Sequence, residues 1–306
     1  MSLEIYDLIV IGGGPAGLTA ALYARRANKT VLILEKNTFG GQITFSPKVE
    51  NIPGFLSLTG NEFAEKLVEQ VLEQGADVEL CEATGIRIEN DRKVVTTDSG
   101  EFSARAVILA TGAKHRTLGL PREEQFIGDG ISFCAVCDGA FYQGRTVAVI
   151  GGGNSALQEA LLLCEQASRV IVVQNLDELT GEQKLRDLLA EKKNAEVILG
   201  CVVDELLGDE TFSGIRIRKV ATGEMRDLPL DGMFVAIGLL PQNEPFADVV
   251  GLDARGYVAA DESCLTATPG VFVAGDCRAK RIRQVTTAAS DGAVAALAAC
   301  DYLDRA

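Results

Sequence analysis

The sequence predicts an α/β fold with two three-layer domains of the same kind, the second inserted into the first. An internal repeat is the main observation behind this prediction. Residues 7–36 and 146–175 each show an apolar β-branched run, a Gly-rich turn, a helical pattern and a second apolar run. The spacing from Gly12 to Gly151 equals that from Glu35 to Gln174, so the repeat needs no gap. A βαβ unit written twice is typical of two Rossmann-like domains.

The insertion is predicted from the C-terminal part of the chain. The run at 270–276 has the look of a strand and turn that return to the first domain, and a helical pattern follows at 287–303. We therefore expect a first domain made of 1–118 plus 247–306 and a second domain made of 119–246.

Length and charge restrict the class of protein. The chain has 306 residues, enough for two domains that each have a core, and its net charge is -14. This acidic balance argues against nucleic-acid binding, which needs a positive surface. The acidic N-terminal lead lacks the basic flank of a secretory signal, and no apolar stretch is long enough to span a bilayer. We expect a cytoplasmic protein with neither a nucleic-acid nor a membrane partner.

The first Gly-rich turn carries the spacing Gly12-x-Gly14-x-x-Gly17 between an apolar run and a helical pattern. In such turns the first Gly permits the tight bend, the second lets the backbone approach a pyrophosphate, and the third allows close helix–strand packing. The helix N-terminus offers free N–H groups to phosphate oxygens. Glu35 ends the next strand run, where an acid accepts hydrogen bonds from an adenosine ribose. These residues predict a dinucleotide site; the alternative is a tight turn without a ligand.

Eight cysteines and one histidine are present, and two of the cysteines form the motif Cys134-Ala-Val-Cys137. At the start of a helix, such a pair can form a short redox-active disulfide, because helix N-terminal polarity lowers a thiol pKa. Half of a zinc site is one alternative, which the lack of a second such pair disfavours, and an inert structural pair is another. We predict no metal site. His115 is expected at a surface or interface. The other six cysteines are expected to be packing residues: Cys81, Cys164, Cys201, Cys264, Cys277 and Cys300.

Further segments carry a family resemblance that covers nearly the whole chain. They are Gly-Gly-Gln at 40–42, Val-Glu-Asn-Ile-Pro-Gly at 49–54, Ala-Thr-Gly at 110–112, Gly-Asp at 275–276 and Arg-Gln at 283–284. In this order they resemble the FAD-contacting segments of the low-molecular-weight thioredoxin reductases, and the context of the cysteine pair matches that family too. The resemblance implies a homodimeric flavoprotein oxidoreductase that holds FAD.

The resemblance also implies roles for single residues. Asn51 would lie near the flavin ring, Asp276 would hold the ribityl chain, and Asp138 would act as acid and base for the thiols. Arg283 and Gln284 would border the isoalloxazine. The remaining implied FAD contacts are Gly41, Gln42, Thr111 and Gly112.

The activity implied by the resemblance is electron transfer from FAD to the Cys134–Cys137 disulfide, and then to the disulfide of a thioredoxin-like protein. The second domain would rotate between these two contacts, with hinges near 116–121 and 242–246. A hypothesis of another class is a flavin-binding redox sensor whose cysteine pair reports its state without turnover.

The second Gly-rich turn, Gly151-x-Gly153-x-x-Ala156, predicts a candidate second nucleotide site, but the segment after its second strand departs from the family. Family members carry His-Arg-Arg and a further Arg there, which grip the 2′-phosphate of NADPH. The aligned run 174–180 here has no cation, and Leu239 stands where a His is common. A charge-assisted hydrogen bond is worth ~1.5–3 kcal/mol, so the loss of two or three would weaken NADPH binding by several orders of magnitude.

Three electron donors therefore stay open, with NADPH disfavoured. NADH would favour an acid at Gln174, and Asp177 or Glu178 could substitute for it. A reduced ferredoxin would need a docking surface, for which the basic run 278–283 is the candidate patch; its alternative is a plain solvated loop. The third donor is NADPH bound through other cations.

Overall fold

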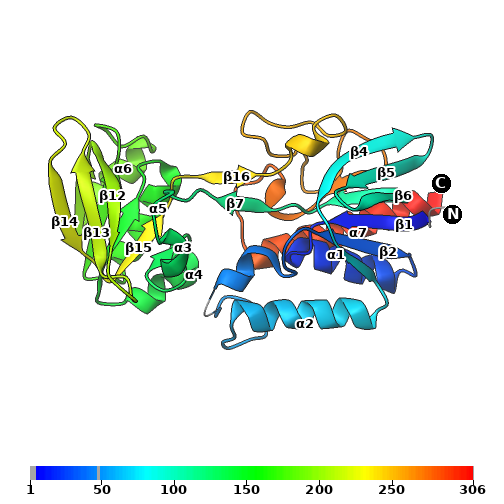
Figure 1. Ribbon diagram of the computed structural model, residues 1–306, viewed down its shortest axis with the longest axis horizontal. Coiled ribbons are helices and arrows are strands. Elements are labelled where there is room, and N and C mark those ends of the chain that lie inside the picture. The colour runs from blue at the N-terminus through cyan, green and yellow to red at the C-terminus, as the bar shows by residue number, and fades with distance from the viewer. Residues whose placement is uncertain (1–4, 47–48, 306) are drawn as a thin grey trace. The chain divides into compact units, whose positions relative to one another are not determined.

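The computed structural model describes residues 5–46 and 49–305, which form two units. One unit contains the described residues up to Lys114 and those from Leu240 onward; the other is His115–Leu239. The chain crosses between them along β7 (Ala113–His115) and β16 (Leu239–Pro241), which pair with each other (Figure 1). Both crossings come a few residues before the boundaries expected from the sequence, because extended backbone continues into each link.

The first unit is built on a seven-stranded sheet with the order β3-β2-β1-β6-β5-β4, to which β17 adds alongside β6. β1, β2, β3, β6 and β17 run parallel, whereas β4 and β5 are antiparallel to their neighbours. The C-terminal segment therefore returns to the first sheet, as predicted. The strands are β1 (Ile5–Ile11), β2 (Val31–Glu35), β3 (Asp77–Leu80), β4 (Ala83–Glu89), β5 (Arg92–Thr97), β6 (Gly100–Leu109) and β17 (Val271–Val273).

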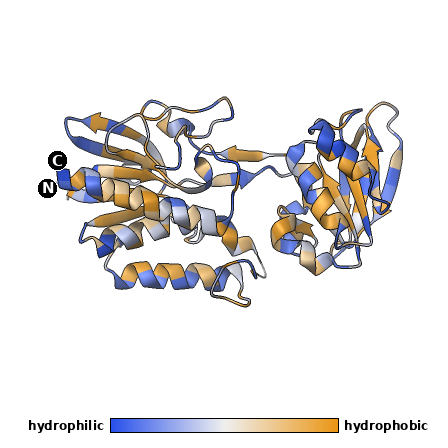
Figure 2. Ribbon diagram, turned by 180° about the vertical axis from the view of Figure 1, so that it is seen from behind, coloured by the Kyte–Doolittle hydropathy of each residue, from blue (hydrophilic) through white to orange (hydrophobic). Residues whose placement is uncertain are grey.

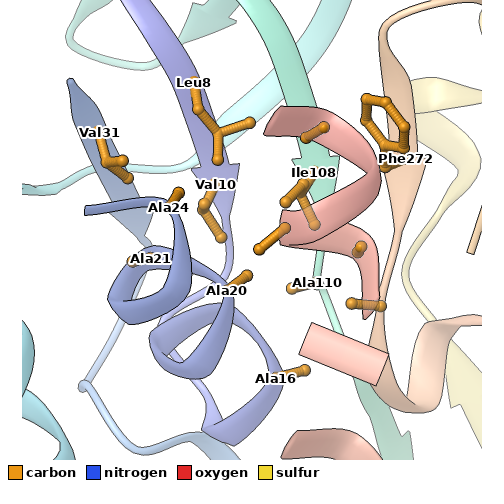
Figure 3. Packing of buried hydrophobic residues seen from close by; sticks show 14 of the residues in the cluster. Leu8, Val10, Ala16, Ala20, Ala21, Ala24, Val31, Ile108, Ala110 and Phe272 are labelled. Carbon is orange, nitrogen blue, oxygen red and sulfur yellow. The ribbon is translucent and has the colours of Figure 1, made fainter. Parts of the chain in front are cut away.

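Three α-helices belong to this unit: α1 (Pro15–Arg26), α2 (Gly60–Glu73) and α7 (Val285–Arg305). Side chains of β1 alternate between two cores, as a two-residue repeat requires. Leu8 and Val10 pack with α1 and α7 (Figure 3), while Ile9 and Ile11 pack with the opposite face. Short 3₁₀ helices complete the unit at η1 (Gly41–Phe45), η3 (Glu244–Phe246) and η4 (Gly275–Cys277).

The second unit repeats this plan with a parallel sheet of order β11-β10-β9-β15-β8. A separate antiparallel sheet, β12-β13-β14, is formed by the part of the chain between β11 and β15. The strands of the second unit are β8 (Ile131–Ser132), β9 (Thr146–Ile150), β10 (Arg169–Gln174), β11 (Ala195–Leu199), β12 (Cys201–Leu207), β13 (Gly214–Lys219), β14 (Met225–Pro229) and β15 (Gly232–Val235). Its helices are α3 (Glu123–Phe126), α4 (Ala135–Asp138), η2 (Gly139–Tyr142), α5 (Asn154–Cys164) and α6 (Gln183–Ala190).

The two repeats share backbone detail as well as topology. The N–H of Gly12 donates to the carbonyl of Leu34 at 2.8 Å, and the N–H of Gly151 donates to that of Val173 at 2.9 Å. This confirms the predicted α/β fold with two Rossmann-like units, the second inserted in the first.

The hydropathy of α2 varies along the helix. Figure 2 shows α2 with apolar and polar residues mixed along its length, as expected for a helix with one packed face. Within residues 5–46 and 49–305, no helix is both long and apolar enough to cross a membrane.

Close contact between α1 and α7 yields a test of the first core. A Cβ added to Gly292 would lie 2.2 Å from the backbone oxygen of Ala16, so only Gly fits. We expect Gly292→Val to destabilise the first unit by about 1–3 kcal/mol, because overpacking forces the helices apart. Urea unfolding measures this change. Gly251→Ala is the control, since no atom lies within 4 Å of its added Cβ; equal midpoints for both variants would contradict the packing account.

Candidate active site

The first Gly-rich turn has the geometry of a phosphate cradle. Gly12 has φ +113°, and a Cβ there would lie 2.3 Å from the oxygen of Ala110. Gly14 is different: the nearest atoms to its added Cβ are those of Gly40 and Gly41 at 3.9 Å. Gly14 is also the N-cap of α1. Open space therefore faces the free N–H groups of the helix N-terminus, where an anionic group is stabilised. Gly17 serves packing, since its Cβ would lie 1.9 Å from the oxygen of Gly12.

Glu35 is held at the carboxyl end of β2 by two backbone donors. Its Oε2 accepts from the N–H of Gly13 at 2.8 Å, and its Oε1 accepts from the N–H of Asn37 at 2.9 Å. A pocket of about 200 Å³ opens beside it, lined by Gly12, Thr111 and Phe246 among others. The volume suits part of a dinucleotide, and the carboxylate lies where a ribose hydroxyl would be recognised.

A second group of predicted residues comes together around η4. Asp276 has a buried oxygen, Oδ1, with no hydrogen-bond partner in the described part of the chain, and burial raises the pKa of this carboxyl group. The Arg283 guanidinium lies over the Tyr257 ring at 4.2 Å and donates from Nε to the backbone oxygen of Asp276 at 3.2 Å. Asn51 Nδ2 contacts Gln284 Oε1 at 3.4 Å. Because buried acceptors are normally paired, Asp276 is suited to a hydroxyl donor of a bound group.

The remaining residues predicted to contact FAD are less tightly packed. Gln42 is exposed on η1, and Gly112 has φ +68° with no atom within 4 Å of an added Cβ. Gly41 lies against Gly14, so η1 borders the glycine turn.

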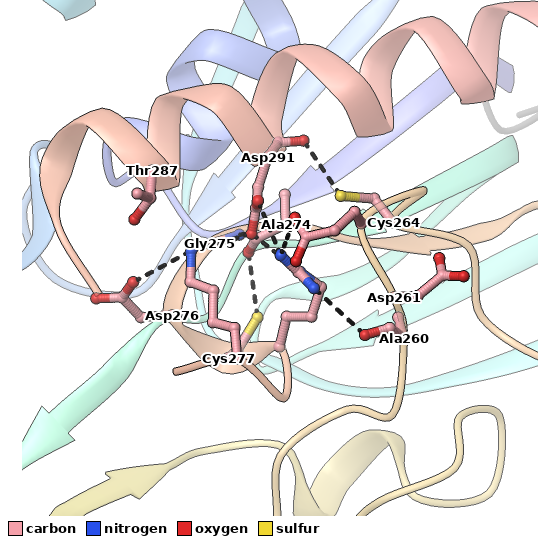
Figure 4. A network of polar contacts seen from close by, with 12 residues as sticks. Ala260, Asp261, Cys264, Ala274, Gly275, Asp276, Cys277, Thr287 and Asp291 are labelled. Atoms are coloured by element: carbon pink, nitrogen blue, oxygen red, sulfur yellow. Dashed lines mark hydrogen bonds and ion pairs between the residues drawn. The ribbon is translucent and has the colours of Figure 1, made fainter. Parts of the chain in front are cut away.

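The basic run 278–283 does not form a surface patch. The Arg278 and Lys280 side chains are only 2% and 6% exposed, and both pair with Asp291 at 3.1 Å (Figure 4). Asp291 also accepts from the N–H of Gly275 at 3.1 Å. The expected continuous basic patch is therefore not formed, since of the four cations in this fully described run only Arg281 is exposed; docking at Arg281 stays a prediction. The charges of Arg278 and Lys280 neutralise a buried carboxylate and hold the turn that carries Asp276.

Asn243 is a site residue that the sequence did not reveal. Its side chain is fully buried, accepts from Thr111 Oγ1 at 2.8 Å and donates to the carbonyls of Gly256 and Cys277 at 2.9 and 3.1 Å. It thereby ties the end of β6 to η4. A single Asn in a loop carries no periodic or motif signal, so only the fold exposes this role.

Cys134 and Cys137 form a disulfide with Cα atoms 5.3 Å apart. Cys134 is the N-cap of α4, and its Sγ accepts from the N–H of Cys137 at 3.2 Å. Since α4 has only four residues, its macrodipole is small, and helix polarity contributes less to thiol activation than the sequence suggested.

Asp138 is fixed beside this disulfide. Ser132 Oγ donates to Asp138 Oδ2 at 2.6 Å and accepts from the N–H of Cys134 at 3.1 Å. Burial raises the pKa of Asp138, and the Ser132 hydrogen bond opposes that rise. Ser132 was missed from the sequence, although a hydroxyl two residues before the first cysteine was the available signal.

The other cysteines and the histidine have different environments. Five of the remaining cysteines are buried and Cys164 is partly buried, which confirms them as packing residues. His115 is half-buried, and its ring stacks on Phe133 with the ring centroids 4.8 Å apart. The expected surface or interface position of His115 stays a prediction. Burial lowers the pKa of His115 to about 4, which leaves it neutral near pH 7.

The second Gly-rich turn is covered by its own loop. The N–H groups of Thr180 and Gly181 both donate to the oxygen of Gly152, at 2.8 and 2.9 Å. Gly153 is the N-cap of α5, and Ala156 is fully buried, so the predicted turn is formed.

The side chains of residues 174–180 do not provide a phosphate clamp. Gln174 is 5% exposed, and its amide contacts the backbone of Glu178 and Asn175. Asp177 Oδ1 would lie 2.6 Å from a Cβ added to Gly200, so Asp177 lies against that turn. Arg186 reaches the loop from α6 and donates to the Leu179 oxygen at 3.2 Å. Its buried Nε has no partner among the described residues, and the sequence pattern did not single it out.

Comparison with known proteins identifies the family. Residues 6–292 match the pyridine nucleotide-disulphide oxidoreductase family. A thioredoxin reductase of Listeria monocytogenes is 39% identical over 303 residues, which cover 99% of this chain and 95% of the relative. The chain belongs to the low-molecular-weight thioredoxin reductase family. It is a thioredoxin-disulfide-reductase-like oxidoreductase, and the family implies FAD and a pyridine nucleotide.

Two further relatives agree with this membership. A protein of Clostridium pasteurianum described as a 34.2 kDa protein in the rubredoxin operon is 41% identical over 298 residues, which cover 97% of each chain. The crystal structure of thioredoxin reductase from Streptococcus pyogenes superposes with a TM-score of 0.95 at 38% identity and covers 100% of both chains.

The buried ion pairs around η4 yield a stability test. We expect Arg278→Met to destabilise the reductase by about 3 kcal/mol, because it leaves Asp291 with one cation fewer in a buried position. Urea unfolding at neutral pH measures the change. Arg281→Met is the matched control, since Arg281 is exposed and its loss should change stability by less than about 0.5 kcal/mol.

The loss of stability in Arg278→Met should depend on pH. Burial alone would raise the pKa of Asp291, but hydrogen bonds from Arg278 and Lys280 hold it below its usual range. A carboxyl group with a depressed folded pKa stabilises the fold above its unfolded pKa and loses that contribution as the pH falls. The difference between the natural protein and Arg278→Met should therefore be full at neutral pH and shrink below about pH 4. A difference that is independent of pH would contradict the pairing.

Proposed function

We propose that this reductase passes electrons from FAD in the first unit through the Cys134–Cys137 disulfide to a thioredoxin-like protein, and that its electron donor is not NADPH. The observation that carries the first part is a disulfide with a buried carboxyl group, Asp138, fixed beside it. Full-length similarity to proteins named thioredoxin reductase supports the choice of partner. Homodimer assembly, which the family resemblance implies, stays a prediction.

The residues present fit FAD. Gly14 and the N-terminus of α1 would take the pyrophosphate and Glu35 the adenosine ribose. The Asp276 oxygen that accepts no hydrogen bond, and that lies 3.8 Å from Lys280 Nζ, would take a ribityl hydroxyl. When bound, FAD supplies a centre that accepts electrons from the donor and delivers two of them to the disulfide. The other residues proposed to border it are Gly12, Gly17, Gly41, Gln42, Asn51, Thr111, Gly112, Arg283 and Gln284.

Side chains around the disulfide can take up and release the protons that its reduction requires. Reduction to two thiols takes up two protons, and Asp138 can hold one of them because burial raises its pKa. Exchange with the partner then begins when one thiol loses its proton and attacks the partner's disulfide. Alternation between FAD and partner would require motion at the links β7 and β16.

The proposal about the donor rests on residues 174–181. This segment carries no cation, its backbone is bonded to Gly152, and the amide of Gln174 is already engaged. NADH and reduced ferredoxin are therefore the favoured donors. Of the cations in residues 278–283, a ferredoxin would find only Arg281 exposed. NADPH would need another cation, for which Arg186 is the candidate.

Turnover distinguishes a reductase from a redox sensor. With a chemically reduced viologen as electron source, the protein should reduce many equivalents of thioredoxin disulfide. Cys134→Ser and Cys137→Ser should abolish this turnover, while Cys164→Ser should retain it because Cys164 lies outside the redox pair. Thiol labelling of thioredoxin measures the product. Reduction of a single equivalent without further turnover would overturn the reductase and favour the sensor.

The effect of the missing cations on NADPH use can be tested by introducing two of them. Asn175 and Leu176 are exposed and stand at the family's Arg-Arg position. The double variant Asn175→Arg/Leu176→Arg should improve kcat/KM for NADPH by roughly 10-fold or more, since one charge-assisted hydrogen bond is worth ~1.5–3 kcal/mol. Val220→Arg/Met225→Arg, also exposed, adds the same charge elsewhere. Equal gains in both variants would indicate a nonspecific charge effect, and no gain in either would contradict the clamp explanation.

A further inference from the structure

Three buried acceptor oxygens without partners among the described residues lie on α4, on α5 and just after α5, and α4 carries the redox disulfide at its N-terminal end. They are Asp138 Oδ1, Glu159 Oε2 and Gln166 Oε1, none of which meets a donor in the part of the chain that the structure describes. Asp138 ends α4, and Glu159 lies on α5, which packs against α4. Gln166 Oε1 would lie 2.8 Å from a Cβ added to Gly139, the residue after Asp138. Buried acceptors are rarely left unpaired, so this cluster lacks a proton donor.

Acidic and phenolic groups face the cluster, together with the cation of Arg145. Burial raises the pKa of Glu159 to about 8, and the negative charge of Asp138 adds to that rise. Burial also raises the pKa of Tyr142 to about 12, with Asp138 contributing. Asp129, Asp231 and Arg145 act on Tyr142 from the same side, and Ser132 hydrogen-bonds Asp138. Because repulsion between like charges is mutual, two ionised carboxylates here disfavour each other.

We propose that Glu159 is a positioning residue that shares one proton with Asp138 and so keeps a proton available to the Cys134–Cys137 pair near neutral pH. A carboxyl proton placed between the two groups turns one acceptor into a donor. Glu159 acts through Asp138 and does not itself meet the sulfur atoms. This inference rests on the proposed function, since it assigns a source of protons for the same disulfide.

The balance of the reduction shows why such a store is useful. When the S–S bond breaks, two electrons and one proton would be supplied by the reduced FAD of the proposed function. The second proton comes from the carboxyl pair, so two thiols result and the pair becomes doubly ionised. Repulsion in that state raises proton affinity, and solvent restores the shared proton. His115 cannot take this role near pH 7, because its imidazole is neutral there, and Leu239 replaces the family's common His.

The pH profile of disulfide reduction tests the proposal. In anaerobic stopped flow, flavin of the photoreduced holoenzyme is reoxidised by the internal disulfide, and flavin absorbance gives the rate. We expect the rate of the natural protein to fall as the shared proton is lost at alkaline pH. Glu159→Gln removes the neighbouring charge, so Asp138 should lose its proton at a lower pH than in the natural protein. Glu159→Asp retains a carboxyl group and should move the profile back toward that of the natural protein.

A matched control separates this effect from a change of fold. Glu165→Gln makes the same chemical change at the exposed C-cap of α5 and should leave the profile unmoved. If Glu159→Gln also leaves it unmoved, the proposal is wrong.

A second readout does not depend on electron transfer. Infrared spectra of protein labelled with ¹³C at Glu should show a protonated carboxyl band at pH 7 that disappears in Glu159→Gln and persists in Glu165→Gln. Its absence from the natural protein would overturn the shared proton even if the reductase turns over. Conversely, a band without any disulfide reduction by flavin would refute the proposed function and leave the protonated Glu159 standing.

Discussion

One backbone hydrogen bond sets the geometry on which both units depend. The first glycine of each Gly-rich turn donates to the carbonyl of the penultimate residue of the following strand, from Gly12 to Leu34 and from Gly151 to Val173. This bond holds the helix N-terminus at the carboxyl end of the sheet, where parallel sheets bind ligands. In the first unit it places Gly14 near Glu35. In the second it fixes α5, the helix that carries Glu159 and packs against α4.

Burial of charge is the second organising feature, and the two units use it differently. Around η4, Arg278 and Lys280 neutralise Asp291, so a buried carboxylate is paired and the turn under Asp276 is held in place. Around α4, no cation among the described residues pairs with Asp138 or Glu159, and their pKa values rise instead. The first arrangement stabilises structure, whereas the second stores a proton where thiol chemistry needs one.

The sequence predicted features that are local or repeat along the chain. The glycine turns, the inserted second unit and the cysteine pair follow from spacing, and the missing cations at 174–180 were visible directly. The sequence could not predict partners that are distant along the chain. Arg278 looked like a surface cation because its partner Asp291 lies on the next helix, and Asn243 is important only because the fold brings it to Thr111. The Asp138–Glu159 pair likewise depends on the packing of α4 against α5.

The central claim is a thioredoxin-reductase-like flavoenzyme whose second unit does not use NADPH. Flavin absorbance during separate anaerobic additions of NADPH, NADH and chemically reduced ferredoxin tests it most directly. The account predicts rapid flavin reduction by NADH or by ferredoxin and little by NADPH at the same concentration. Rapid reduction by NADPH would contradict the account and would mean that another cation, such as Arg186, replaces the family's clamp.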